Sequence, residues 1–182
     1  TSDSLILPVL HYYTEKKDEH HLPEAYYYAG RVYRDLEDAP LALDYFQKAI
    51  DALPDNKGYR LKSKIYSQMG TLFLYQKTYD EALKILKEAR KCNIALKDSA
   101  SMVFNLRDIA NGYRCLDQND SSLYYLRKAY YIAKVLRNYD LMAMVQSQMA
   151  SLYIELEKYD LARKFLQPSL DSLDIPSRSG IF

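Results

Sequence analysis

Small and large apolar residues recur along the chain in a pattern that repeats every 40 residues. A small residue sets the frame, at Gly30, Gly70, Ala110 and Ala150. An aromatic residue follows three positions later, at Tyr33, Phe73, Tyr113 and Tyr153. A triplet of small, large and small residues comes next, and its large members are Phe46, Leu86, Leu126 and Leu166. Because the triplet spacings of four and three keep side chains on one face of an α-helix, the pattern predicts four helical hairpins.

Each hairpin is predicted to hold a first helix with the frame residue and a second helix with the triplet. The expected first helices span 22–37, 59–76, 99–117 and 140–157, and the second helices span 39–53, 79–97, 120–137 and 159–173. Asp38, Asp98 and Asn138 are expected N-caps, because their side-chain oxygens can accept from free backbone N–H groups. A hairpin buries only part of its apolar surface, so neighbouring hairpins are expected to stack and complete a continuous core.

The stretch 23–54 resembles a tetratricopeptide repeat along its full length. Tyr26 stands where that family prefers tryptophan, and the closing proline is Pro54. The stretch that begins at Ile65 matches nearly as well, and the resemblance covers about residues 23–170. It implies an all-α fold: a right-handed α-α superhelix of about four hairpins with an additional N-terminal helix. The period of 40 exceeds the family's usual 34, and the longer helices resemble those of bacterial tetratricopeptide regulators and sensors.

We expect residues 1–182 to form one domain. Its predicted parts are a leading half repeat at 1–18, four repeats at 22–54, 59–97, 99–137 and 140–173, and a tail at 174–182. Ile6, Val9 and Leu10 fall in the inward stripe of the half repeat. Pro168 is expected to kink or stop the last helix, since proline removes a backbone donor. The tail, a second copy of the chain or residues outside this sequence would then cover the last hairpin, so a homo-oligomer through the ends is one interpretation.

Composition narrows the functional classes. A formal net charge of +1 gives no basic excess, so we expect this segment not to contact nucleic acid. No apolar run reaches the length that a bilayer requires, so no membrane insertion is expected. Cys92 and Cys115 lack metal-ligand spacing and are interpreted as small packing residues, which favours a cytoplasmic location; the chain could equally be the soluble part of a membrane-anchored protein. No phosphate loop, metal motif or nucleophile elbow is present, so neither a cofactor nor an enzyme is predicted.

The resemblance places the binding surface in the groove that the first helices line. The groove positions that it implies include Tyr27, Arg31 and Arg34 in the first copy and Arg107, Asn111 and Arg114 in the third, with Tyr75 and Gln148 nearby. Arg107, Asn111 and Arg114 resemble half of a carboxylate clamp. The alternative is that these arginines are solvated or paired with nearby acids such as Asp108 and Asp117. The four arginines favour an acidic segment as ligand, with Tyr27 and Tyr75 as contact surface.

The predicted function is therefore a non-catalytic scaffold that binds a protein or peptide in its groove. The alternative is a sensory or regulatory module of a larger membrane-anchored or DNA-binding bacterial signalling protein. A transmembrane helix or winged-helix domain elsewhere in the gene would favour that alternative.

Overall fold

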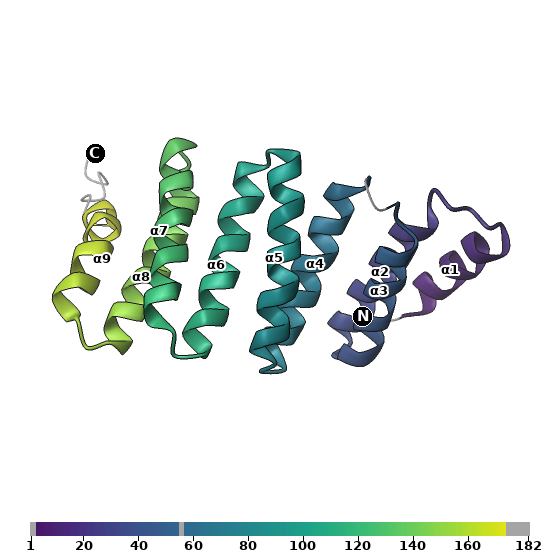
Figure 1. The fold of residues 1–182 in the computed structure, drawn as a ribbon, viewed down its shortest axis with the longest axis horizontal. Helices are drawn as coiled ribbons and strands as arrows, with labels where there is room; N and C mark the ends of the chain where they lie inside the picture. The colour runs from purple at the N-terminus through teal and green to yellow at the C-terminus, as the bar shows by residue number, and fades with distance from the viewer. Residues whose placement is uncertain (1–2, 55–56, 174–182) are drawn as a thin grey trace, which may run out of the picture.

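The computed structural model describes residues 3–54 and 57–173, with side chains up to residue 166. This part of the chain is a single row of helices without strands (Figure 1). A short 3-10 helix, Asp3–Leu5, leads into α1 (Ile6–Glu15), α2 (Leu22–Asp35), α3 (Ala39–Asp51), α4 (Tyr59–Tyr75), α5 (Tyr79–Leu96), α6 (Ser99–Cys115), α7 (Asn119–Val135), α8 (Tyr139–Glu155) and α9 (Tyr159–Leu173). The predicted right-handed α-α superhelix is confirmed.

The predicted helices are found with their ends within about two residues of the expected positions. All three predicted N-caps are also confirmed. Asp38 accepts from the backbone N–H of Leu41 at 3.1 Å, and Asp98 accepts from that of Ser101 at 3.0 Å. Asn138 does the same for Leu141 at 3.0 Å. The division of the chain into one domain and numbered repeats remains a prediction, and the expected tail at 174–182 lies outside the described residues.

The connectors share a left-handed residue that recurs every 20 positions. Positive φ angles are found at Lys17, Glu37, Lys77, Lys97, Asp117, Arg137 and Glu157, and Gly58 takes this role one position late after α3. The next residue donates its N–H back to the carbonyl five residues earlier, as from Thr78 to Phe73 at 3.0 Å. This arrangement is a Schellman-type helix end. Since the donor also begins the following helix, three residues suffice to end one helix and start the next.

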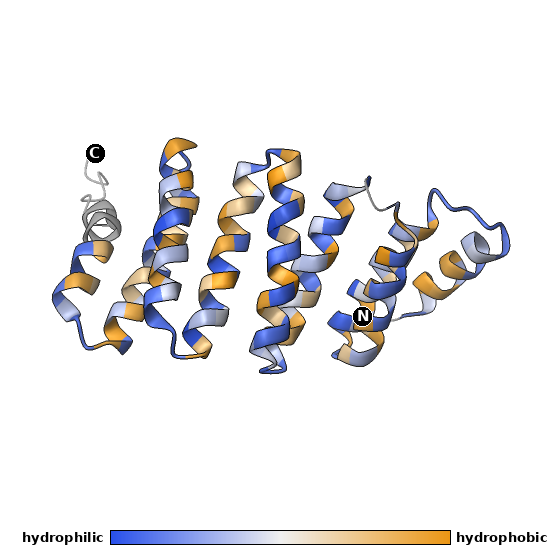
Figure 2. Cartoon of the chain, in the orientation of Figure 1, coloured by the Kyte–Doolittle hydropathy of each residue, from blue (hydrophilic) through white to orange (hydrophobic). Residues whose placement is uncertain are grey.

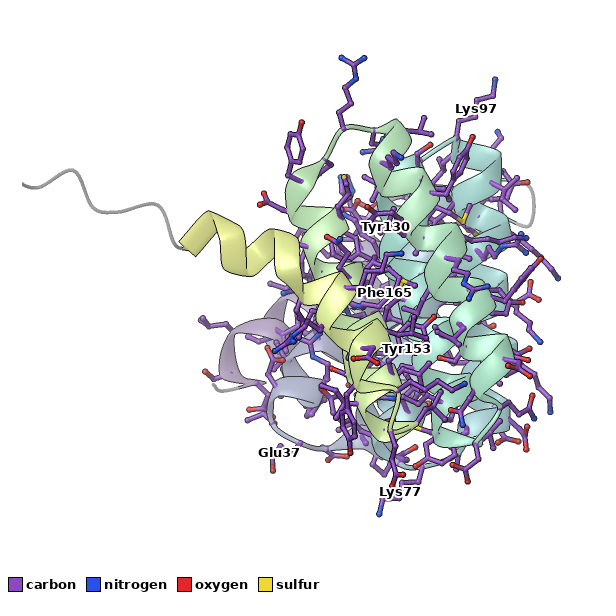
Figure 3. All side chains as sticks on the ribbon, turned by 90° about the vertical axis from the view of Figure 1, so that its left-hand side faces the viewer. Glu37, Lys77, Lys97, Tyr130, Tyr153 and Phe165 are labelled. Atoms are coloured by element: carbon purple, nitrogen blue, oxygen red, sulfur yellow. The ribbon has the colours of Figure 1, made fainter. Side chains whose placement is uncertain are left out.

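The two kinds of connector lie at opposite ends of the helices. Glu37 and Lys77, which turn the chain within hairpins, lie at one edge of the solenoid, and Lys97, between hairpins, lies at the other (Figure 3). Two helices and two short connectors together make up the 40-residue period. The linkers after α1 and α3 are longer than the other connectors of the described chain, and α3 is correspondingly shorter than α5. The backbones of α3 and α4 also approach one another over less of their length than those of α5 and α6.

First and second helices have different neighbours. Each first helix packs against the next first helix, so α2 contacts α4, α4 contacts α6 and α6 contacts α8. Within the described residues, neighbouring second helices do not approach one another in this way. The first helices therefore form the inner face of the curved stack, and the second helices form a more widely spaced outer face.

The small frame residues permit close packing inside a hairpin. A Cβ added at Gly30 would lie 2.5 Å from the Phe46 ring, and one at Gly70 would lie 2.5 Å from the Leu86 side chain. Both large residues are fully buried. Apolar and polar residues are interspersed along each described helix, whereas the connectors are mostly polar (Figure 2).

Several expectations at the ends and for the cysteines need correction. In α1, Leu10 is buried but Val9 is 41% exposed, so the inward stripe is only partly formed. Of the two outcomes expected at Pro168, a kink or a stop, the helix does not stop: it continues to Leu173 and changes direction along its length (Figure 3). Cys92 is buried as expected, but Cys115 is exposed.

The described part of the last hairpin keeps a partly open edge, and what covers it stays a prediction. Leu161 is 42% exposed, whereas Phe165 stacks on Tyr153 with ring centroids 5.6 Å apart (Figure 3).

Candidate functional site

A cavity of about 330 Å³ lies on the inner face and is called the inner pocket below. Three consecutive first helices supply its lining, which consists of Thr71, Leu74 and Tyr75 from α4, Arg107, Asp108, Asn111 and Arg114 from α6, and Gln148 from α8. Five of the eight residues that the sequence marked as candidates therefore meet in one place: Tyr75, Arg107, Asn111, Arg114 and Gln148.

Helix α6 provides the centre of the inner pocket because Arg107, Asn111 and Arg114 are spaced by four and three residues, which puts them on one face. Arg114 donates through Nη2 to Oδ1 of Asn111 at 2.9 Å and through Nη1 to Oε1 of Glu155 at 3.2 Å. Arg107 donates through Nε and Nη2 to Oδ1 of Asp108, at 3.0 and 2.7 Å. Each arginine of the pocket is thus held by a carboxylate of the same chain.

These ion pairs decide between the two interpretations of the arginines. Arg107 is paired with Asp108, which agrees with the interpretation that the arginines bind acidic residues of the same chain. For Arg114 the partner is Glu155 of α8 rather than Asp117. Sequence reasoning missed Glu155 because it lies 41 residues further along the chain. One signal in the sequence could have indicated Glu155. It follows Ile154, which occupies on the neighbouring first helix the repeat position that Arg114 occupies on α6.

Asp108 gives the inner pocket a titratable group. Burial raises the pKa of its carboxyl above the usual 3.8, and the adjacent Arg107 guanidinium opposes part of that rise. A carboxyl group in this state takes up a proton at a higher pH than an exposed aspartate does. Protonation of Asp108 would leave the Arg107 guanidinium without its anionic partner.

The other three candidate residues lie on α2, away from the inner pocket. The expectation that Tyr27 offers open contact surface is wrong, because it is only 7% exposed and packs near Phe46. Tyr28 is the exposed neighbour, at 51%. Arg31 lies over the Tyr27 ring, with its guanidinium carbon 5.9 Å from the ring centroid. Arg34 donates to Gln68 of α4 and to Asp35.

A complete carboxylate clamp is not assembled in the inner pocket. The α4 positions that correspond to Arg107 and Asn111 are Ser67 and Thr71, and the Thr71 hydroxyl donates to the Ser67 carbonyl at 2.9 Å. Guanidinium and amide donors are therefore concentrated on α6, with Gln148 as the additional amide. The inner pocket can offer hydrogen bonds of both polarities, because donors and one carboxylate share its lining.

The chain was compared with known proteins by sequence and by fold. Residues 23–56 match the family described as tetratricopeptide repeat. No curated protein sequence matches the chain. Among solved structures, tetratricopeptide-like repeats of a putative kinesin light chain from Podosopora anserina superpose with a TM-score of 0.79 at 16% identity, covering 97% of this chain and 87% of that one. BtubC (BKLC) from P. vanneervenii gives 0.76 at 16% identity, covering 100% and 73%.

Aspartyl phosphate phosphatase F from Bacillus subtilis is also similar, with a TM-score of 0.73 at 19% identity over 84% of this chain. The chain spans only 41% of that phosphatase chain. Identities this low show a shared fold and nothing about ligands. In the part of the chain that the structure describes, no helix is long and apolar enough to cross a membrane. Residues 23–56 thus match a tetratricopeptide repeat, and the described chain shares the helical solenoid fold of tetratricopeptide-like repeat structures.

Proposed function

We propose that the protein is a non-catalytic scaffold that binds a peptide segment of another protein across its inner face. The observation that carries this proposal is the convergence of Tyr75, Arg107, Asn111, Arg114 and Gln148 on one cavity from three consecutive first helices. A tetratricopeptide fold in general supports a protein-interaction role. The inner pocket adds a place where a ligand would contact several repeats at once.

The chemistry of the inner pocket suits an extended segment. The amides of Asn111 and Gln148 can pair with a peptide backbone, which presents donors and acceptors in alternation. Tyr75 is 81% exposed at the rim and offers an amphipathic ring to a ligand side chain. An acidic side chain would bind Arg107 or Arg114 only by competing with Asp108 or Glu155. Acidic character in the ligand therefore helps less here than the number of arginines suggests.

The proposed groove extends toward α2. Arg34 reaches α4 through Gln68, so its guanidinium lies on the same inner face. Arg31 has a buried Nε without a hydrogen-bond partner. We include both arginines as secondary contacts, and Tyr27 as the packing that holds Arg31 in place.

The test compares crosslinked partner capture by the native chain and by an Arg107→Ala/Asn111→Ala/Arg114→Ala variant. Circular dichroism first establishes that the variant is folded. A matched control, Lys84→Ala/Lys87→Ala, removes two exposed α5 cations outside the inner pocket. We expect a partner captured by the native chain and the control to be lost with the triple variant. Equal capture by all three chains would refute the inner-face proposal.

A second candidate function is the regulatory module of a larger bacterial signalling protein. The observation that favours it is the 40-residue repeat with long helices, together with the fold shared with aspartyl phosphate phosphatase F. In that case ligand binding would alter the curvature of the solenoid. Small-angle scattering of the chain with and without its captured partner tests this, since a simple docking scaffold would keep its curvature.

A further inference from the structure

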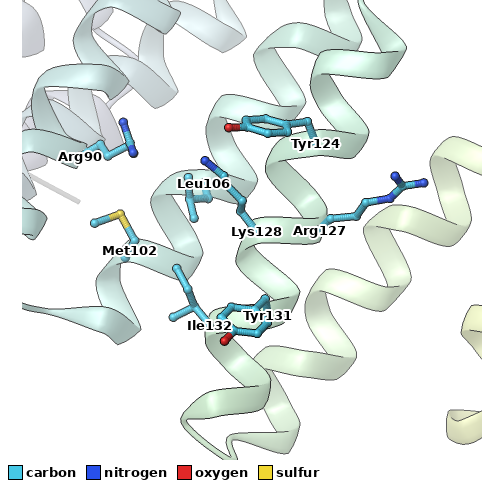
Figure 4. A pocket seen from close by; sticks show the side chains of 8 residues that line it. All are labelled: Arg90, Met102, Leu106, Tyr124, Arg127, Lys128, Tyr131 and Ile132. Atoms are coloured by element: carbon cyan, nitrogen blue, oxygen red, sulfur yellow. The ribbon is translucent and has the colours of Figure 1, made fainter.

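A second cavity, of about 430 Å³, opens on the opposite face of the solenoid and is called the outer cleft (Figure 4). Its lining is Arg90 of α5, Met102 and Leu106 of α6, and Tyr124, Arg127, Lys128, Tyr131 and Ile132 of α7. The cleft exists because α5 and α7 are neighbouring second helices whose backbones do not approach closely. The side chains of α6 form the floor between them.

The walls of the outer cleft are positively charged. Arg90, Arg127 and Lys128 are the three cations of the lining, and the eight lining residues include no aspartate or glutamate. Lys128 extends toward Leu106, whereas the Arg127 guanidinium points away from Leu106 and Met102 (Figure 4). Among the side chains that the structure describes, at residues 3–54 and 57–166, no ion pair is found for any of these three. The Nε of Arg90 is buried and has no hydrogen-bond partner. A buried donor without a partner costs free energy, and an anionic ligand beside the Arg90 guanidinium would reduce that cost.

The floor and rim of the outer cleft are apolar and aromatic. Leu106 and Met102 lie at the bottom, with Ile132 beside them. Tyr124 and Tyr131 are 52% and 68% exposed on the α7 side. The Lys128 ammonium lies 4.4 Å from the Tyr124 ring centroid, so this ring helps to position the cation. Exposed tyrosines and arginines around an apolar centre are the composition that protein–protein contact sites favour.

The equivalent interval one repeat earlier, between α3 and α5, has polar residues and a carboxylate where the outer cleft has an apolar floor and a cation. Glu88 stands at the position of Lys128 and pairs with Lys91 at 2.7 Å. Lys62 stands at the position of Met102, and its ammonium donates to the Pro54 carbonyl at 2.7 Å. Tyr66 replaces Leu106. Lysines stand at the positions of Tyr124, Arg127 and Tyr131, so the earlier interval is cationic as well. The apolar floor and the absence of a carboxylate from the lining are what distinguish the α5–α7 interval.

We propose that the outer cleft docks an acidic segment of a second protein, which places an apolar side chain on Leu106 and Met102 and its carboxylates near Arg90, Arg127 and Lys128. Charge complementarity selects this occupant, since the cations lack acidic partners within the described chain. The arginines can hold carboxylates through paired N–H groups. This site is separate from the inner pocket and does not depend on the function proposed for it.

The experiment measures binding of a short fluorescein-labelled peptide in which aspartates and glutamates flank a central leucine–phenylalanine pair. We expect fluorescence polarisation to detect binding to the native chain. Reversal of charge in Arg127→Glu/Lys128→Glu should weaken it by about tenfold or more, because attraction becomes repulsion. The matched control Lys84→Glu/Lys87→Glu changes the same number of charges on α5, and it should bind within about twofold of the native chain.

Single tryptophans locate the bound peptide, since the chain contains 19 Tyr and no Trp. Tyr131→Trp reports from the outer cleft, and Tyr75→Trp reports from the inner pocket. The unlabelled peptide should shift the emission of the first reporter and leave that of the second unchanged. A shift at Tyr75→Trp alone would overturn the assignment of the acidic segment to the outer cleft, while supporting the inner-face proposal.

Two further probes test the chemistry. A peptide with the central pair replaced by glycine and serine should bind more weakly, because the apolar floor is then left without a partner. Equal affinity would show that the cleft is merely a charged surface and would overturn the proposal. A short single-stranded DNA that binds more tightly than the peptide and displaces it would also overturn it, by assigning the cations to phosphates.

Discussion

The inner pocket and the outer cleft are similar in size, about 330 and 430 Å³, but they differ in whether their cations are paired with carboxylates of the chain. In the inner pocket, Arg107 is held by Asp108 and Arg114 by Glu155. In the outer cleft, Arg90, Arg127 and Lys128 line a cavity without a carboxylate. The number of arginines in a site is therefore a poor guide to its charge, because the partners within the chain decide how much of it a ligand meets.

Helix α6 separates the two sites and contributes to both. Leu106 lies on the floor of the outer cleft, and its neighbour Arg107 lies in the inner pocket. Adjacent residues on a helix point in different directions, so one helix can present an apolar side to one cavity and a polar side to the other. Four predictions test the difference between the inner pocket and the outer cleft.

The largest expected effect is the loss of stability when an apolar residue at the floor of either site is replaced by alanine. Leu106 is 2% exposed, so Leu106→Ala should lower the free energy of unfolding by about 2–5 kcal/mol. Leu74, which lines the inner pocket, is only partly buried, and Leu74→Ala should cost about half as much. Urea unfolding followed by circular dichroism measures both. Similar losses would mean that the two floors do not differ in burial.

The second largest expected effect is a difference between the two sites in how salt changes their ligand affinity. Binding of the acidic peptide to the outer cleft is expected to weaken by about tenfold between low and high ionic strength, since exposed charges are screened over distances of about a Debye length. Binding to the inner pocket should change less, because its arginines are already neutralised. Titration of the acidic peptide against the Tyr131→Trp reporter gives the first salt dependence. Titration of a peptide from the partner captured by the inner pocket against the Tyr75→Trp reporter gives the second. Parallel slopes would contradict the contrast.

The pH dependence of stability should reveal Asp108. The pKa of its carboxyl is raised in the folded chain, so the folded state binds the proton more tightly than the unfolded state, whose carboxyl has a pKa near 3.8. Its contribution to stability is therefore fully present below about 3.8 and is lost as pH rises through the folded pKa. Relative to Asp108→Asn, the native chain should become less stable by up to about 1 kcal/mol as the pH rises through that range.

Asp98 serves as the internal control for this measurement. The N–H and hydroxyl of Ser101 lower the pKa of the Asp98 carboxyl, so its contribution is present above about 3.8 and is lost as pH falls through the folded value. The differences between native and variant for Asp98→Asn and Asp108→Asn should consequently have opposite pH slopes. Unfolding free energies at several pH values supply both comparisons, and slopes of the same sign would refute the assigned shifts.

The smallest expected effect is that of Glu155→Gln. The ion pair with Arg114 is partly exposed, so the free energy of unfolding should change by less than about 0.5 kcal/mol. Removing the carboxylate frees Arg114 for a ligand, so the acidic peptide, which leaves the Tyr75→Trp emission unchanged while Glu155 is present, should gain affinity for the inner pocket. Reporter titrations with Tyr75→Trp test this. An unchanged affinity would show that Glu155 does not compete with an acidic ligand for Arg114.

The helices were predictable from sequence because burial at fixed spacing constrains residue size. The constraint is clearest where a small frame residue contacts a large buried one, as Gly30 contacts Phe46 and Gly70 contacts Leu86. Asp38 was recognisable as an N-cap because its side chain has a local partner. The grouping of Arg107, Asn111 and Arg114 followed for the same reason, since all three belong to one helical face.

Features that depend on contacts between helices were not predictable. Glu155 meets Arg114 only because α6 and α8 pack side by side. Tyr27 is buried because it faces Phe46, which the run of three tyrosines does not reveal. The outer cleft depends on the spacing of α5 and α7, which follows from the curvature of the whole stack.

The left-handed joints at 20-residue intervals have a consequence for how such a chain can change length. Lys97 and Arg137 occupy the same backbone conformation, and each is followed by a residue that caps the next helix. A deletion of residues 98–137 would therefore connect Lys97 to Asn138 through an unchanged joint, removing one whole hairpin together with the floor and the α7 wall of the outer cleft. Growth or shortening of this solenoid in steps of 40 residues preserves every remaining turn, whereas other insertions must be absorbed by irregular linkers such as the one after α3.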